Sequence, residues 1–299
     1  MMRKPAGFER PNARLLADGR RLHLSHGPID LIIEADGAPA EVTRAYRQAR
    51  EAFETILHDL VRELPLLRSG NANRPRGTVA RRMHEATTPY RPEFITPMAA
   101  VAGSVADHVL ANLIAGRVLS RAYVNNGGDI ALRLNEGVFR VGICDDPVTG
   151  AAGGMILVRP DDEIGGVATS GWRGRSHSLG IADAVTVLAP NAAKADAAAT
   201  MIANKVDLPG SLRIEREPAR KLAPDSDLGT RLVTTGVENL TRAEIATALD
   251  NGETAATGYL ERSLFKAAYL SLAGDRRTLS PASTITQNAD HIREEPVCA

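Results

Sequence analysis

The chain has 299 residues, of which 43% are hydrophobic and 24% are charged, the composition of an ordinary globular protein with enough material for a core. Its 36 Lys and Arg balance 36 Asp and Glu, so the formal net charge of zero argues against a protein built for non-specific nucleic-acid binding. The two cysteines, Cys144 and Cys298, are too few for a disulfide framework or a four-thiolate zinc site. No apolar run predicts a secretory signal or a membrane span, so we expect a cytoplasmic protein with no membrane partner.

The first third of the chain predicts a hairpin followed by a long helix. Two β-prone runs flank His26-Gly27-Pro28, which reads as the turn of a hairpin. Residues 38–70 place apolar side chains at helical spacing and end at Gly70, which predicts one long amphipathic helix. Residues 70–97 carry repeated Pro and Arg and predict an irregular connection with one short helix.

Strands and small-residue helices are expected after residue 97. Two buried helices are predicted at 98–117 and 191–206, because small apolar residues occupy most of their faces. A third helical region is expected at 241–274. Strands with turn residues between them are predicted at 121–134, 139–146, 153–162, 163–171 and 183–190.

This grouping of strands and helices favours an α+β fold over a doubly wound one. We expect residues 1–275 to form a single domain whose motif-bearing core is 97–206. Residues 276–299 are polar, and we expect them to form a frayed tail.

Asp196 and Thr200 are the first candidates for chemistry, since residues four apart share one helix face. A carboxylate and a hydroxyl are oxygen ligands that Mg²⁺ accepts together with waters or phosphates. The alternative is a solvent-facing Asp near the start of a helix, which the helix dipole favours.

Two glycine-containing motifs also allow two interpretations. Asn126-Gly127 predicts a tight hairpin turn, but the same segment can bring the backbone close to a ligand and aim Asp129 into a site. Gly103 and Ser104, at an expected helix start, can hold an anionic group or simply allow close helix packing.

The loop at 169–177 concentrates cationic and hydrogen-bonding residues beside strand sequence, and we expect it to line a cleft between two halves of the protein. Arg173 and Arg175 flank a glycine and suit a phosphate. His177 can move a proton near neutral pH. Trp172 can stack on a flat ligand or serve as a packing anchor.

Taken in order, these motifs resemble those of the ApbE family of FAD:protein FMN transferases. The resemblance covers about residues 97–206 and rests on VNNGGDIAL, ATSG with a following SH, VTVLAP and ADAAAT. It is closest to the stand-alone branch of the family. It implies an α+β, T-fold-like architecture of antiparallel sheets packed on helices, with pseudo-symmetric halves, and FAD or FMN as ligand or substrate.

The resemblance also implies roles for individual residues. Asp196, Thr200 and the carbonyl of Ala106 correspond to the family's magnesium ligands, and His177 to a histidine near the chemistry. The remaining motif positions would line the flavin nucleotide site: Gly103, Ser104, Gly127, Gly128, Asp129, Thr169, Ser170, Arg173 and Arg175.

The chain departs from the family at two places. Asp107 and His108 stand where the transferases have a lysine and a glycine, and the segment after His177 is shortened, with Asp183 as the candidate replacement acid. Two functions stay open. One is a Mg²⁺-dependent transferase or hydrolase acting on a flavin nucleotide or related diphosphate, and the other is a non-catalytic protein that binds a flavin- or pterin-like ligand. A small-molecule, phosphate-bearing ligand is expected in both cases, and a homodimer is compatible with either.

Overall fold

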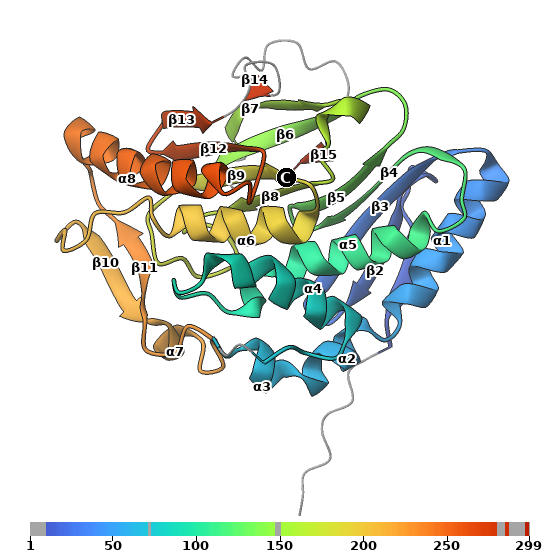
Figure 1. Ribbon diagram of the computed structural model, residues 1–299, viewed down its shortest axis with the longest axis horizontal. Helices are drawn as coiled ribbons and strands as arrows, with labels where there is room; N and C mark the ends of the chain where they lie inside the picture. Colours follow the sequence, from blue (N-terminus) through green and yellow to red (C-terminus); the bar gives the residue numbers. More distant parts are fainter. Residues whose placement is uncertain (1–9, 71–72, 147–150, 280–284, 287–296, 299) are drawn as a thin grey trace, which may run out of the picture.

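The computed structural model describes residues 10–70, 73–146, 151–279, 285–286 and 297–298. A nine-stranded antiparallel sheet runs through it, and helices cover one face of this sheet (Figure 1). In spatial order its strands are β1 (Asn12–Leu15), β2 (Leu22–His26), β3 (Ile29–Gly37), β4 (Leu119–Asn126), β5 (Asp129–Leu134), β8 (Gly166–Ser170), β9 (Ala184–Ala189), β12 (Ala267–Leu272) and β13 (Asp275–Leu279).

The sheet consists of two halves with the same order of elements. In the first half, hairpin β2–β3 is followed by helices and then by hairpin β4–β5; in the second, β8–β9 is followed by helices and then by β12–β13. In each half the two hairpins lie side by side, joined through the pairs β3–β4 and β9–β12. The expected α+β fold with pseudo-symmetric halves is therefore confirmed.

Four helices pack along the covered face in the order α1 (Pro39–Phe53), α5 (Val101–Leu113), α6 (Ala192–Ala203) and α8 (Arg242–Glu261). One hydrophobic core lies beneath α1 and α5, and a second beneath α6 and α8. A four-stranded sheet packs on the opposite face around Phe139 and Ile156, and its strands are β14 (Ile285–Thr286), β7 (Ala151–Val158), β6 (Phe139–Asp146) and β15 (Val297–Cys298).

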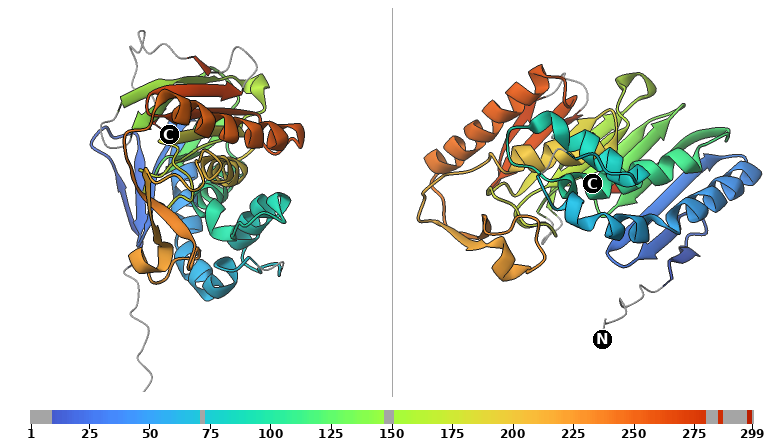
Figure 2. Two further views of the ribbon diagram at one scale, coloured as in Figure 1. Left: turned by 90° about the vertical axis from the view of Figure 1, so that its left-hand side faces the viewer. Right: turned by 60° about the horizontal axis from the view of Figure 1, so that its bottom comes forward.

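The remaining elements lie outside these layers. The strands β10 (Ile214–Pro218) and β11 (Leu232–Val237) form a two-stranded arm together with α7 (Ala219–Leu222), as Figures 1 and 2 show. The connection from α1 to α5 contains α2 (Ile56–Arg62), α3 (Leu64–Leu67) and α4 (Thr78–Thr87), with 3₁₀ turns at Thr88–Tyr90 and Pro97–Ala100. A further 3₁₀ turn, Pro160–Asp162, lies between β7 and β8. No helix of the described residues is both long enough and apolar enough to cross a membrane.

Three expectations about the elements were wrong. The helix expected at 38–70 is divided into α1, α2 and α3, and Pro65 in the first turn of α3 explains the second break, since proline has no N–H to continue a preceding helix. Residues 267–272 are strand β12, not helix. All six are buried, and a fully buried strand has no alternating pattern to distinguish it from a buried helix.

The third correction concerns the tail. Residues expected to fray beyond Asp275 instead form β13, which pairs with β12 up to Leu279 and is the strand at one edge of the main sheet. The remainder of the predicted tail lies outside the described residues, apart from the short strands β14 and β15. The single domain at 1–275 stays a prediction.

Candidate functional site

The centre of the candidate site is the crossing of α5 and α6. A Cβ placed on Gly103 would lie 2.3 Å from the carbonyl oxygen of Ala192 and 2.8 Å from the amide nitrogen of Ala193. Both contacts are with backbone, which cannot move aside as a flexible side chain can. Gly103 therefore permits the close approach of the two helix starts, so the packing interpretation explains this glycine directly.

Each helix supplies a carboxylate to the start of the other. Asp196 of α6 accepts the N–H of Gly103 at 3.0 Å. Asp107 of α5 accepts the N–H groups of Ala192 and Ala193 at 3.0 and 2.9 Å. Acidic side chains are stabilising at helix N-termini, where backbone N–H groups lack partners within the helix. Asp196 therefore does stabilise a helix N-terminus, as the dipole interpretation expected, but the helix is α5 and not α6, to which Asp196 belongs.

Both carboxyl groups titrate well above their ordinary range. Burial raises the pKa of Asp107 to about 6, although the two N–H donors and the charge of Arg82 act against it. Burial also raises the pKa of Asp196 to about 7, against the N–H groups of Gly103 and Ala102, and the negative charge of Asp107 raises it further. Both carboxyl groups are therefore harder to ionise than exposed ones, because the ionised forms have lost part of their hydration.

The turn between β4 and β5 brings a third carboxyl group to the crossing. The two-residue loop is Gly127-Gly128, with φ of +64° and +113°, so the tight turn falls one residue later than the predicted Asn126-Gly127. Asn126 donates to the carbonyl oxygen of Ala102 at 3.1 Å and fixes the turn to the first residues of α5.

Asp129, the first residue of β5, follows this turn. Burial raises its pKa well above the usual range, and the negative charge of Asp196 raises it further. The N–H of Thr169 and the charge of Arg175 oppose this shift. Residues from β5, α6, β8 and the loop that follows β8 therefore meet at a pair of carboxyl groups that destabilise each other's charge.

Arg175 lies directly over the turn. A Cβ on Gly127 would fall 1.6 Å from Nη2 of Arg175, so the guanidinium occupies the space that any other residue would fill. The structure thus brings together the glycine turn, Asp129, Asp196 and Arg175, all of which the sequence placed in one site.

The other half of the loop is held by Asp183. Its carboxylate accepts from Nε1 of Trp172 at 3.3 Å, from Nε of Arg173 at 3.0 Å and from the N–H of Ala273 at 2.6 Å. The guanidinium of Arg173 also lies 5.0 Å from the centre of the Trp172 ring. Trp172 and Arg173 are therefore anchors of the loop, while Arg175 extends toward the carboxyl pair.

His177 is exposed, and no described residue forms a hydrogen bond with its ring. Asp183, the candidate replacement for the acid missing after His177, already accepts hydrogen bonds from three other donors. Thr169 shares a hydrogen bond of 2.8 Å with Thr186, and Ser170 at the end of β8 is partly exposed. The catalytic and ligand-binding roles of these residues stay predictions.

The predicted magnesium ligands lie on the two crossing helices. Asp196 and Thr200 are partly exposed on α6, while Ala106 is fully buried in α5. Asp129, whose pKa is raised by the charge of Asp196, adds a second carboxyl group near these residues, and carboxyl, hydroxyl and carbonyl oxygens are the donor type that a hard divalent cation accepts. The described residues contain no group of three or more His, Cys, Asp or Glu that could hold a metal, so waters or phosphate oxygens would complete the coordination.

Ser104 is completely buried, and its hydroxyl has no hydrogen-bond partner among the described residues. Its place in the first turns of α5 is as expected, whereas its predicted contact with a ligand stays untested.

Two residues have roles that the sequence did not predict. Asp107 departs from the family pattern and Asn126 belongs to a predicted turn, but both form hydrogen bonds with the backbone of a neighbouring helix. A buried acid in a small-residue helix and an asparagine just before a glycine turn are the signals that could have identified them, since both types bond readily to backbone.

A model of the family described as AbpE bacteria matches residues 13–278. The chain belongs to this family. It is 42% identical over 113 residues to a UPF0280 protein of Methanocaldococcus jannaschii, which covers 37% of this chain and 44% of that protein. It is 40% identical over 129 residues to a UPF0280 protein of Methanopyrus kandleri, covering 42% and 48%. The chain thus spans less than half the length of these curated relatives.

Two solved structures are similar at a lower level. The flavin transferase ApbE from Vibrio cholerae has 14% identity and a TM-score of 0.36, over 66% of this chain and 87% of that one. The Pseudomonas stutzeri flavinyl transferase ApbE in its apo form has 13% identity and a TM-score of 0.32, over 79% and 96%.

Proposed function

We propose that this AbpE-family protein is a Mg²⁺-assisted transferase or hydrolase acting on a flavin nucleotide or a related diphosphate. The observation that carries the proposal is the meeting of Asp129, Asp196 and Arg175 at the start of α5, from segments far apart in the sequence. Paired carboxyl groups beside an exposed guanidinium suit a diphosphate with its cation, which needs both negative and positive partners.

Different residues would bind the metal ion and the phosphate groups. Asp196, Thr200 and the carbonyl of Ala106 would hold the ion, and Asp129 would add negative charge close to it. When bound, Mg²⁺ would supply a positive charge that stabilises the diphosphate oxygens. Arg175 would bind a phosphate oxygen directly, because its position over Gly127 leaves it exposed.

His177 would transfer the proton in this reaction. It would accept the proton of the attacking hydroxyl or water as the bond between the two phosphates breaks and AMP leaves from FAD. Its exposed ring is accessible for such a step.

One observation favours the alternative, a non-catalytic protein that binds a flavin- or pterin-like ligand. His177 has no orienting partner among the described residues, and Asp183 is occupied by Trp172, Arg173 and Ala273. A general base usually depends on a group that orients it, so its absence here suits binding better than turnover.

The test pairs a binding measurement with product analysis. We expect flavin fluorescence to show tighter binding of FAD with Mg²⁺ than with a chelator, and chromatography after incubation to show FMN or AMP. Binding without product would favour the non-catalytic alternative. No binding of FAD or FMN under either condition would exclude flavin nucleotides as ligands.

A further inference from the structure

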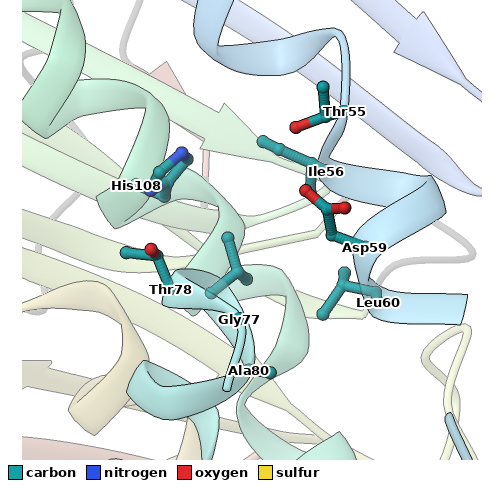
Figure 3. Close-up of a pocket in the computed structure, with 9 residues that line it drawn as sticks. Thr55, Ile56, Asp59, Leu60, Gly77, Thr78, Ala80 and His108 are labelled. Atoms are coloured by element: carbon teal, nitrogen blue, oxygen red, sulfur yellow. The ribbon is translucent and has the colours of Figure 1, made fainter. Parts of the chain in front are cut away.

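A cavity of about 140 Å³ lies between α2, the first turn of α4 and His108 of α5, as Figure 3 shows. The residues that line it include one carboxylate, that of Asp59, and no lysine or arginine. A phosphate group would therefore find no cationic partner in this cavity. The loop at 171–177 supplies such a partner in Arg175, so the groups that fix this loop determine how a phosphate is bound beside the carboxyl pair.

Asp183, directly before β9, fixes the first part of the loop. Its side chain is 14% exposed, and both of its carboxylate oxygens accept hydrogen bonds. Oδ1 accepts from Nε1 of Trp172 at 3.3 Å and from Nε of Arg173 at 3.0 Å. Oδ2 accepts from the N–H of Ala273 at 2.6 Å. Because Ala273 lies in the turn between β12 and β13, this carboxylate joins the loop to the last two strands of the main sheet.

Backbone contacts reinforce this attachment. The N–H of Trp172 donates to the carbonyl oxygen of Ala182 at 3.0 Å, and the N–H of Gly174 donates to that of Gly171 at 3.2 Å. A Cβ placed on Gly171 would lie 2.2 Å from the carbonyl oxygen of Asp183, so the start of the loop is in direct contact with the chain that enters β9. Residues 171–174 are therefore held against β9.

The far end of the loop is fixed as well. The carbonyl oxygen of Ser178 accepts from the N–H of Thr234 in β11 at 2.9 Å, and the N–H of Leu179 donates to Oδ1 of Asn204 at 2.9 Å. Residues 175–177 are thus a short exposed span between two fixed ends. Loss of the first attachment would add residues 171–174 to this span, and a longer free segment is costlier to hold in one position.

Arg175 extends from this span to the turn between β4 and β5, where its Nη2 lies 1.6 Å from the place of a Cβ on Gly127. We propose that Asp183 is a positioning residue instead of a replacement acid, and that it holds the loop so that Arg175 lies over the turn and meets a phosphate group of the nucleotide. The inference rests on the proposed function for the identity of that ligand. It follows from the contacts of Asp183, whose two oxygens are already bonded to the loop and to Ala273.

A cycle of variants of the full chain tests this role: Asp183→Ala, Arg175→Ala and the double variant, each titrated with FAD in the presence of Mg²⁺. We expect Asp183→Ala to weaken FAD binding about tenfold, as Arg175→Ala does, because both remove the same charge-assisted contact. The double variant should bind no more weakly than Arg175→Ala alone, since the two residues act as one unit. Additive losses, or the parent's affinity in Asp183→Ala, would overturn the proposal.

Asp183→Asn distinguishes positioning from acid catalysis. It keeps the oxygen that accepts from Trp172 and Arg173, so FAD affinity should stay within a few-fold of the parent and any product formation should be retained. Loss of product in Asp183→Asn with unchanged FAD binding would instead show a catalytic acid. Asp275→Ala is the matched control, because Asp275 is exposed at the end of the same turn as Ala273, and this variant should bind FAD as the parent does.

A measurement without flavin separates this proposal from the proposed function. Trp172 is the only tryptophan of the chain, so its fluorescence reports the attachment of the loop. In Asp183→Ala its emission should shift to longer wavelength and be quenched more strongly by acrylamide, because the indole loses its acceptor and gains contact with water. If the parent binds neither FAD nor FMN and Trp172 responds in this way, the proposed function fails and the positioning of the loop by Asp183 is supported. Unchanged emission and quenching would overturn the positioning role, whatever the flavin result.

Trp172→Phe provides a second variant if Asp183→Ala does not fold. It removes one of the three donors to Asp183 and keeps an aromatic ring. FAD binding should weaken in the same direction by a smaller factor, and the parent's affinity in this variant would overturn the proposal.

Discussion

The α5–α6 crossing and the loop at 171–177 form two sides of the candidate site, and they are built in opposite ways. At the crossing, Asp107 and Asp196 are desolvated and accept backbone N–H groups of the facing helix. In the loop, Arg173 and Arg175 are exposed, and Arg173 is held by a side chain. Changes at Gly103 and Asp107 in the crossing should therefore affect mainly folding stability, and changes in the loop mainly ligand binding. Asp196, which is also a predicted metal ligand, should affect both.

The largest expected effect on stability is that of Gly103→Ala. The new methyl group would overlap the backbone of Ala192, and overpacking of this kind costs about 3 kcal/mol of unfolding free energy. Chemical denaturation measures this difference. Gly258→Ala in α8 is the control, since a Cβ there meets nothing within 4 Å, and we expect it to be neutral or slightly stabilising. Equal stabilities of the two variants would contradict the close crossing.

Asp107→Ala should have the next largest effect. It removes the acceptor of two buried N–H groups at the start of α6, which costs about 2 kcal/mol. Asp107→Asn keeps one acceptor oxygen and should lose less. If thermal unfolding shows both variants to be as stable as the parent, Asp107 does not stabilise the crossing.

Asp196 should make stability depend on pH. Its pKa in the folded protein, about 7, lies above the ordinary value of 3.8, so the folded state binds more protons than the unfolded state between these values. Stability should then be highest below about pH 4 for this group and fall as pH rises to about 7. Asp129, whose pKa is also raised, should add to the fall.

Asp196→Asn should reduce this fall, so that without metal the variant is more stable than the parent at pH 8, while Mg²⁺-dependent ligand binding is lost. Denaturation at a series of pH values measures the first effect and flavin titration the second. Asp161→Asn, at an exposed position, is the control. A variant with the parent's pH profile would show that Asp196 is not desolvated.

Arg175→Ala should leave stability nearly unchanged, since the side chain is exposed. It should weaken FAD binding by about tenfold or more through the loss of a charge-assisted hydrogen bond, and the difference should shrink at high salt. Arg133→Ala, exposed on the neighbouring strand β5, provides the control. If both variants lose the same FAD affinity, the effect comes from the overall charge of the protein and not from a direct contact of Arg175 with the ligand.

His177→Ala should have the smallest effect on stability and on binding, with FAD affinity within a few-fold of the parent. It should nevertheless remove product formation, because acid–base assistance acts in the transition state. The amount of product formed by the variant and by the parent is measured at saturating FAD and Mg²⁺. Unchanged turnover would exclude His177 from the chemistry.

Local patterns were enough to predict many elements. The hairpin at His26-Gly27-Pro28, the buried helices α5 and α6, and the strands from β4 to β9 follow from turn residues and from spacing of apolar side chains, which act over a few residues. The motif order also identified the family and the α+β class. Strand β12 could not be predicted in this way, because burial on both faces removes the alternation that distinguishes a strand.

The sequence by itself determined which residue types are available to the site: a glycine turn, two arginines, a histidine and acids on small-residue helices. Only the tertiary structure decided how they pair. It joined Asp183 to Arg173, Asp196 to Gly103 and Asp107 to the start of α6, and it extended Arg175 over Gly127. These pairings join residues that are between 10 and 93 positions apart in the chain, and the partners meet only when both halves of the sheet and their helices have packed.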